Sequence, residues 1–195
     1  MKKTVQLGFF LSLALILAYI ETLIPLSFGI PGIKLGLPNL IVVLLMYQKD
    51  AKQGYRNKEN VKTDKAGLNT VGQSMAKEAF LINVLRIVLS GFMFSNLYAI
   101  MYALAGALLS FTAMSFGKKM RCFSMIGVSV LGGVAHNIGQ IVIAILVVET
   151  FYVGYYIPFL ITAGTITGAV LGLAAMELRP YLMKYMGSEE GMKGR

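Results

Sequence analysis

The sequence predicts an all-α membrane protein: one domain over residues 1–195, folded as a bundle of six transmembrane helices. The first observation is composition, because 56% of the residues are hydrophobic and only 14% are charged. Such a balance is typical of membrane proteins and not of soluble domains of this length. The second is a series of six long apolar runs that use almost the whole chain, which leaves no room for a second domain. The third is where the basic residues lie between those runs.

Basic residues cluster in alternate gaps. All but two of the 18 Lys and Arg residues lie at the two ends of the chain or in the second and fourth gaps between apolar runs. Because Lys and Arg accumulate on the cytoplasmic side, this pattern predicts a multi-pass protein of the cell membrane with both termini in the cytoplasm. The basic residues behind the net charge of +9 are then expected to contact anionic lipid headgroups, and no nucleic-acid partner is expected. The two exceptions are Lys34, in the first gap, and Arg86, inside an apolar run.

The apolar runs predict helices at about 4–26, 36–48, 78–95, 97–117, 123–148 and 155–177. The first has no small-x-small cleavage site before Glu21, so we expect an uncleaved helix rather than a signal peptide. The second is short: at about 1.5 Å per residue it covers roughly 20 Å of a hydrocarbon core about 30 Å thick. The Pro- and Gly-rich stretch 25–38 before it predicts a break. That stretch, which carries Lys34, is either a lid over a site on the outer face or a plain extracellular loop.

Two further features of the sequence are a long polar stretch and regularly spaced small residues in three of the predicted helices. The stretch at about 48–77 is rich in Lys, Asn, Gly and Gln and predicts a flexible cytoplasmic loop, with a docking role as the alternative. Small residues recur every fourth position in the first, fourth and sixth helices, which predicts faces for close helix packing. The strip on the first helix, Ala14 and Ala18, could equally form an outer docking surface.

Candidate binding residues are the few polar side chains inside the predicted spans, because each is expensive to place in hydrocarbon. Asn83 and Arg86 share one face of the third helix, and His136 and Gln140 lie four apart on the fifth. By the rise of about 1.5 Å per residue, most of these groups fall in the outer half of the bilayer. The predicted ligand-binding residues are Lys34, Asn39, Asn83, Arg86, His136, Asn137 and Gln140.

Structural alternatives stand beside this assignment. Arg86 can pair with Glu21 inside the bundle, His136 can bond to a neighbouring helix, and Asn39 can cap its own helix. One His and the lone Cys122 make no metal site, and no cofactor is expected. The chain has no paired carboxylates on one helix turn, no nucleotide-binding signature and no plausible Ser-His-Asp set. It is therefore not expected to be an enzyme, and any active transport needs a partner or an ion gradient for energy.

Three stretches carry a resemblance to a known family. They are Pro-Gly-Ile-Lys-Leu-Gly-Leu-Pro-Asn at 31–39, Asn-Val-Leu-Arg at 83–86, and Gly-Gly-Val-Ala-His-Asn-Ile-Gly-Gln at 132–140. They resemble the Gx transporter family, many members of which are labelled heptaprenyl diphosphate synthase component I. The resemblance covers nearly the whole chain apart from 48–77. The helix count, the alanines of the first helix and the Pro/Gly loop also resemble the substrate-binding S components of energy-coupling factor (ECF) transporters.

These resemblances imply two functions. As an ECF S component, the chain would capture a small anionic or polar molecule for an importer. Ala14 and Ala18 would then contact the membrane coupling subunit, and separate ATPase subunits would supply energy. The family label implies instead a membrane accessory subunit of heptaprenyl diphosphate synthase or of isoprenoid or quinone metabolism. Chain elongation by such a synthase needs aspartate-rich magnesium sites, and the only aspartates are Asp50 and Asp64. A third possibility is a purely structural bundle in which Arg86 and Glu21 pair.

Overall fold

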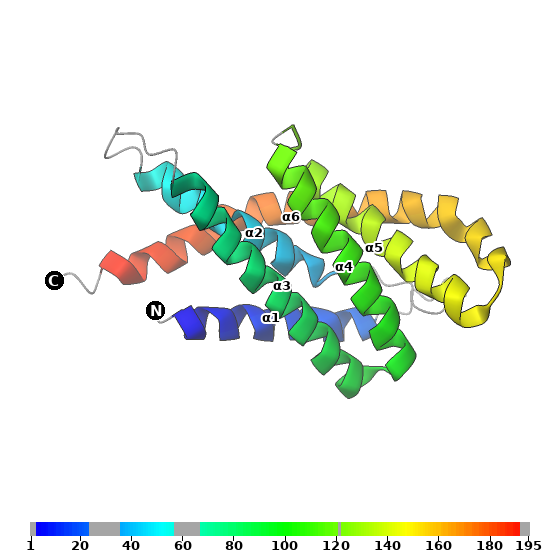
Figure 1. Ribbon diagram of the computed structural model, residues 1–195. Helices are drawn as coiled ribbons and strands as arrows, with labels where there is room; N and C mark the ends of the chain where they lie inside the picture. Colours follow the sequence, from blue (N-terminus) through cyan, green and yellow to red (C-terminus); the bar gives the residue numbers. More distant parts are fainter. Residues whose placement is uncertain (1–2, 24–35, 57–66, 121, 192–195) are drawn as a thin grey trace.

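The computed structural model describes all residues except 1–2, 24–35, 57–66, 121 and 192–195, and every regular element in the described part is a helix. This confirms the all-α prediction. The elements, shown in Figure 1, are α1 (Lys3–Leu23), α2 (Asn39–Arg56), α3 (Gly67–Phe94), α4 (Leu97–Met120), α5 (Met125–Val148), the 3₁₀ helix η1 (Phe151–Tyr156) and α6 (Ile157–Gly191).

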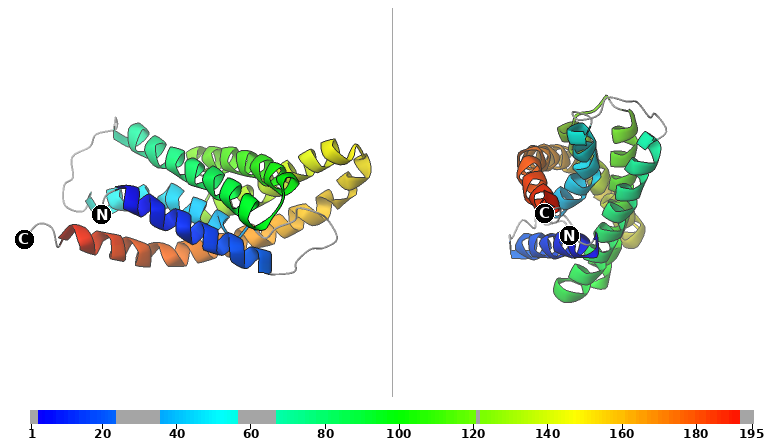
Figure 2. Two further views of the ribbon diagram at one scale, coloured as in Figure 1. Left: turned by 90° about the horizontal axis from the view of Figure 1, so that it is seen from below. Right: turned by 90° about the vertical axis from the view of Figure 1, so that its left-hand side faces the viewer.

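Four stretches of helix within the described residues are long and apolar enough to cross a membrane: α1, α4, α5, and η1 together with α6. Large apolar side chains such as Phe116, Leu146 and Val170 remain exposed on them, as expected of faces that meet lipid. α3 is not among the four, and the apolar part of α2 is short, Asn39–Gln48. The first turn of α1 and the last turn of α6 lie at the same end of the bundle (Figures 1 and 2). Six crossings and cytoplasmic termini stay predictions.

Two helices extend further than the hydropathy predicts. Within the stretch 48–77, expected to be a loop, α2 continues to Arg56 and α3 begins at Gly67. Lys, Gln and Ala are good helix formers, and extending an existing helix costs less than nucleating a new one. α6 runs to Gly191, past Pro180, instead of ending near 177. Helix ends outside the membrane leave no hydropathy signal, so the pattern could not locate them.

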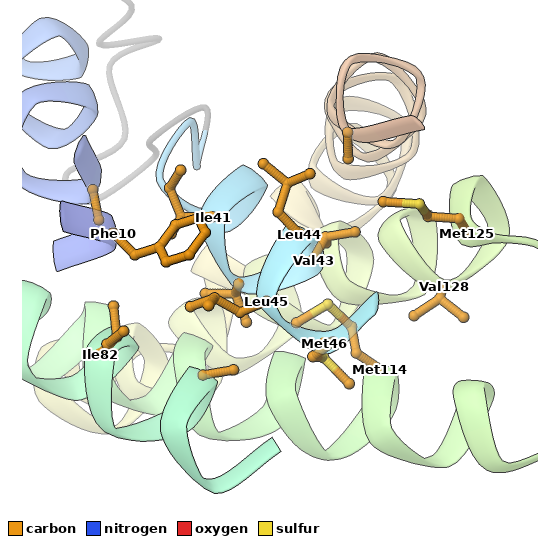
Figure 3. Close-up of a cluster of buried hydrophobic side chains, with 14 residues drawn as sticks. Phe10, Ile41, Val43, Leu44, Leu45, Met46, Ile82, Met114, Met125 and Val128 are labelled. Carbon is orange, nitrogen blue, oxygen red and sulfur yellow. The ribbon is translucent and has the colours of Figure 1, made fainter. Parts of the chain in front are cut away.

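α2 lies at the centre of the bundle. Each residue from Ile41 to Met46 is at most 4% exposed. Six consecutive helical residues are buried together only when neighbours surround the helix on every side. The core cluster around them takes side chains from all six α-helices, from Phe10 of α1 to Ala175 of α6. Figure 3 shows the α2 side chains at the centre of that cluster.

Backbone contacts hold α5 against its neighbours α4 and α6. A Cβ atom added at Gly133 would lie 2.4 Å from the carbonyl oxygen of Gly164, and one added at Gly168 would lie 2.7 Å from Cα of Val130. The glycine strip of α6 therefore faces α5, as small residues at a spacing of four predict. This contact fixes the position of α5, the helix that carries His136.

Replacing Gly133 by Ala should destabilise the protein by about 1–3 kcal/mol, because the atom it meets is backbone and cannot rotate aside. The thermal unfolding midpoint in detergent measures this loss. Gly8→Ala on α1 is the matched control, since a Cβ atom there meets nothing within 4 Å. Equal midpoints for the two variants would contradict the close α5–α6 contact.

Candidate functional site

α3 places one charged and one polar group in the interior. Asn83 and Arg86 are 1% and 7% exposed, and Arg86 Nη2 donates a hydrogen bond to Asn83 Oδ1 at 2.6 Å. Their spacing of three residues puts both on one helix face. Arg86 Nε and Asn83 Nδ2 have no hydrogen-bond partner among the described residues. Two buried donors are thus unsatisfied, which costs free energy.

α1 supplies the opposite charge. Glu21 is buried near the end of α1, and its carboxylate accepts a hydrogen bond from the backbone N–H of Gly36. The carboxylate also lies close enough to Arg86 for their charges to attract. Gly36 has φ +74°, a conformation that L side chains rarely adopt, and leads into the first turn of α2. Glu21 is therefore positioned to act as the counter-charge of the buried Arg86.

α5 contributes the remaining polar side chains. His136 and Gln140 are buried and one turn apart, and Gln140 Oε1 has no partner among the described residues. Gly106 of α4 makes room for the imidazole, since a Cβ atom there would lie 2.9 Å from His136 Nδ1. Asn137 points elsewhere: its Nδ2 donates to the carbonyl of Leu160 at 2.8 Å and so ties α5 to α6.

Two cavities adjoin these groups. The first, here called the Arg86 cavity, has a volume of about 30 Å³, space for about two water molecules. Helices α1 to α5 all line it, and its polar lining residues are Glu21, Thr22, Asn39, Arg86, Ser90, Ser95, His136 and Gln140. Thr22 and Ser95 are exposed, so the lining of the cavity extends to residues at the protein surface. An organic ligand would require the surrounding helices or side chains to move apart.

The second cavity, here called the Ser110 cavity, measures about 10 Å³ and lies between α2, α4, α5 and α6. Its polar lining residues are Asn39, Ser110, Ser129, His136, Asn137 and Thr167. The two cavities share Gly36, Asn39 and His136. Asn39 and His136 therefore stand between them.

The structure brings together most of the residues predicted to bind a ligand. Asn39, Arg86, His136 and Gln140 line the Arg86 cavity, and Asn83 is bonded to Arg86. Asn137 lines only the Ser110 cavity, and Lys34 lies outside the described residues. Within the described part of the chain, no group of three or more His, Cys, Asp and Glu residues could hold a metal ion.

The first-helix alanines point into the bundle. Ala14 belongs to the core cluster, and Ala18 lines the Arg86 cavity. Neither offers an outer surface in this conformation, and their contact with a coupling subunit stays a prediction.

Some site residues have little or no signal in the sequence. The sequence predicts Glu21 only as a possible partner of Arg86, and it gives no reason to single out Ser110, Ser129 and Thr167. A serine in an apolar helix looks the same whether it faces lipid or the interior. Only the packing of α4 against α5 distinguishes Ser110 from its neighbour Thr112.

Fold and site together define an all-helical protein, four stretches of which can cross a membrane, with a charged and hydrogen-bonding site buried between its helices. A family model described as heptaprenyl diphosphate synthase component I matches residues 10–56 and 66–178. The chain belongs to the heptaprenyl diphosphate synthase component I family. No curated protein and no solved structure matches it.

A double-mutant cycle decides whether Glu21 and Arg86 act as a pair. Glu21→Gln and Arg86→Met should each destabilise the protein, while the double variant recovers part of the loss, giving a coupling of about 0.5–3 kcal/mol. Reversible unfolding in mixed micelles measures it. A cycle of Glu21→Gln with Arg179→Met is the control, because Arg179 bonds to the carbonyl of Tyr47 instead. Coupling near zero in both cycles would rule out the pair.

Proposed function

We propose that this chain is a non-catalytic membrane subunit that works with a soluble prenyl diphosphate synthase and binds a small polar molecule in the Arg86 cavity. The observation that carries the proposal is the family match, which extends over both sides of the 48–77 stretch. The match includes all the helices that line the cavity. On this proposal the chain lies in the cell membrane with both termini in the cytoplasm, where such a synthase can meet it.

The proposal assigns this chain no catalytic role because of the residues that such chemistry needs. Prenyl diphosphate chain elongation uses clustered carboxylates to hold magnesium against diphosphate. The only aspartates of this chain, Asp50 and Asp64, lie in the polar stretch 48–77, outside the apolar runs that carry the residues of the buried site. The partner would therefore supply the catalytic carboxylates, and this chain would supply the membrane site.

The lining of the Arg86 cavity favours a polar or zwitterionic molecule over a simple anion. Arg86 Nε offers a donor and Gln140 Oε1 an acceptor that no described residue uses. Glu21 offsets the charge of Arg86, so with a neutral His136 the described lining has no net charge. A ligand that carries both a hydrogen-bond donor and an acceptor, or both charges, matches this lining best.

A second candidate is the S component of an ECF-type importer, with a membrane coupling subunit and ATPase subunits as partners. One observation favours it: Thr22 and Ser95, which line the Arg86 cavity, are exposed. A receptor that captures a solute from outside needs a site that extends to exposed residues. Both candidates require the same buried site.

Co-purification separates the two candidates. The tagged full-length chain is cross-linked in its own membrane, extracted, and its partners identified by mass spectrometry. We expect a soluble prenyl diphosphate synthase subunit to be enriched over a membrane protein bearing the same tag. Enrichment of a coupling subunit and ATPases would select the importer, and enrichment of neither would leave a purely structural bundle.

Arg86→Ala tests the binding site itself. Native mass spectrometry of the purified protein should show at least about tenfold less retained small molecule than wild type, because a hydrogen bond to a charged group contributes about 1.5–3 kcal/mol. Arg179→Ala is the control, since Arg179 is a partly buried arginine that lines neither cavity. Equal retention in wild type and Arg86→Ala would show that Arg86 does not hold the ligand.

A further inference from the structure

The hydroxyl group of Ser110 lacks the hydrogen bond that several other hydroxyl groups of the bundle make, and it shares this with Ser115 Oγ, which lines neither cavity. In apolar helices Ser and Thr usually donate to a carbonyl one turn earlier. Thr112 does so to Leu108 O at 3.0 Å, and Thr165 to Ile161 O at 2.8 Å. Ser110 is 1% exposed, yet its Oγ has no hydrogen-bond partner among the described residues. Because an unsatisfied buried hydroxyl costs free energy, a polar group in the adjoining cavity is expected.

The Ser110 cavity is suited to an uncharged group. Apart from the imidazole of His136, its polar side chains are the hydroxyls and amides already named, and no Lys, Arg, Asp or Glu lines it. Gly132 keeps the space open, since a Cβ atom there would lie 2.6 Å from the sulfur of Met114 and 3.3 Å from Ser110 Oγ. The volume of about 10 Å³ is close to the minimum for one water molecule.

The cavity also continues the polar path from the surface. The lining of the Arg86 cavity includes the exposed residues Thr22 and Ser95, and it shares Asn39 and His136 with the lining of the Ser110 cavity. On α5, Ser129 precedes His136 by seven residues, roughly 10 Å along the helix axis. The polar residues that line the two cavities therefore extend from the α3–α4 turn to Ser129. Ser129 lies about one helical turn after Met125, the first residue of α5.

We propose that the Ser110 cavity is an inner compartment of the binding site that takes a small uncharged hydrogen-bonding group after passage between Asn39 and His136. Water fills it in the unloaded protein, and the uncharged end of the ligand fills it in the loaded one. The ligand is then an elongated polar molecule with an ionisable group at the Arg86 end and a hydroxyl, carbonyl or amide at the Ser110 end. The claim that a ligand enters the Ser110 cavity rests on the proposed function. The claim that water fills the cavity does not.

Silver-ion accessibility tests the compartment. Ag⁺ is small enough to follow water and reacts with thiolate, which forms only where water reaches the thiol. Cysteines are introduced singly by Ser90→Cys, Ser110→Cys and Ser129→Cys in a Cys122→Ser background, which removes the native thiol. The protein, in lipid nanodiscs and chloride-free buffer, is treated with Ag⁺ and then denatured and alkylated. Intact mass reports the protected fraction.

The expected result is that the Ser90→Cys, Ser110→Cys and Ser129→Cys thiols all react at least about tenfold faster than the thiol of Leu109→Cys. Leu109 is adjacent to Ser110 on α4 but is 41% exposed on the outer surface of the bundle, where lipid would surround it. Reaction at Ser90→Cys with none at Ser110→Cys and Ser129→Cys would overturn the inner compartment and leave the proposed function untouched. No reaction at any of the three would count against both.

Adding Ala103→Phe tests the route, because Ala103 lines the Arg86 cavity and a phenyl ring would fill it. The added ring should slow Ag⁺ reaction at the Ser110→Cys thiol at least as much as at the Ser90→Cys thiol. Undiminished reaction of the Ser110→Cys thiol would mean that water enters by another route, which overturns the continuity of the two cavities.

Native mass spectrometry tests whether the ligand enters the Ser110 cavity, because it measures how much co-purified small molecule the protein retains. Ser110→Ala should lower retention of the co-purified molecule about two- to tenfold, the loss of one neutral hydrogen bond. Thr112→Ala is the control, because that hydroxyl is exposed and bonded to its own helix. Unchanged retention in Ser110→Ala, together with loss in Arg86→Ala, would overturn the inner compartment as a ligand site while upholding the proposed function.

Discussion

The burial of the Arg86 guanidinium is the constraint on which the rest of the site depends. A cation inside an apolar bundle is stable only with a counter-charge and hydrogen bonds to its donors. Asn83, one turn earlier on α3, provides a hydrogen bond, and Glu21 provides the negative charge from α1. The same carboxylate accepts a hydrogen bond from the Gly36 N–H just before α2, so Glu21 connects α1 with the turn at Gly36 and lies near the charge of Arg86 on α3.

That connection matters because α2 is the element that the other helices surround. Its apolar residues form the centre of the core, and its first residue, Asn39, stands between the two cavities. A ligand that displaces Glu21 from Arg86 would therefore act on the α1–α2 turn as well as on the cavity. On the proposed function, ligand binding would be coupled to the position of α2, and a partner protein that contacts α2 would respond to occupancy of the site.

Local spacing predicted the pairs within a helix, and tertiary packing decided how those pairs met. The three-residue spacing of Asn83 and Arg86 and the four-residue spacing of His136 and Gln140 sufficed to place each pair on one face. These faces of α3 and α5 meet at the same cavity because of the way the two helices lie around α2. The residue spacing within each helix does not determine that arrangement. The burial of Ala14, the hydrogen bond of Asn137 to α6 and the open hydroxyl of Ser110 depend on the same packing. The helical parts of 48–77 were missed because hydropathy reports burial in lipid, not helix length.

A crystal structure of the protein purified from its own membrane tests the central claim most directly. The account predicts non-protein density within hydrogen-bond distance of Arg86 Nε, with Asn83 Oδ1 still bonded to the guanidinium. If instead Arg86 Nε donates to a protein group and side chains close the Arg86 cavity, the guanidinium is a structural ion and the binding function assigned to it is wrong.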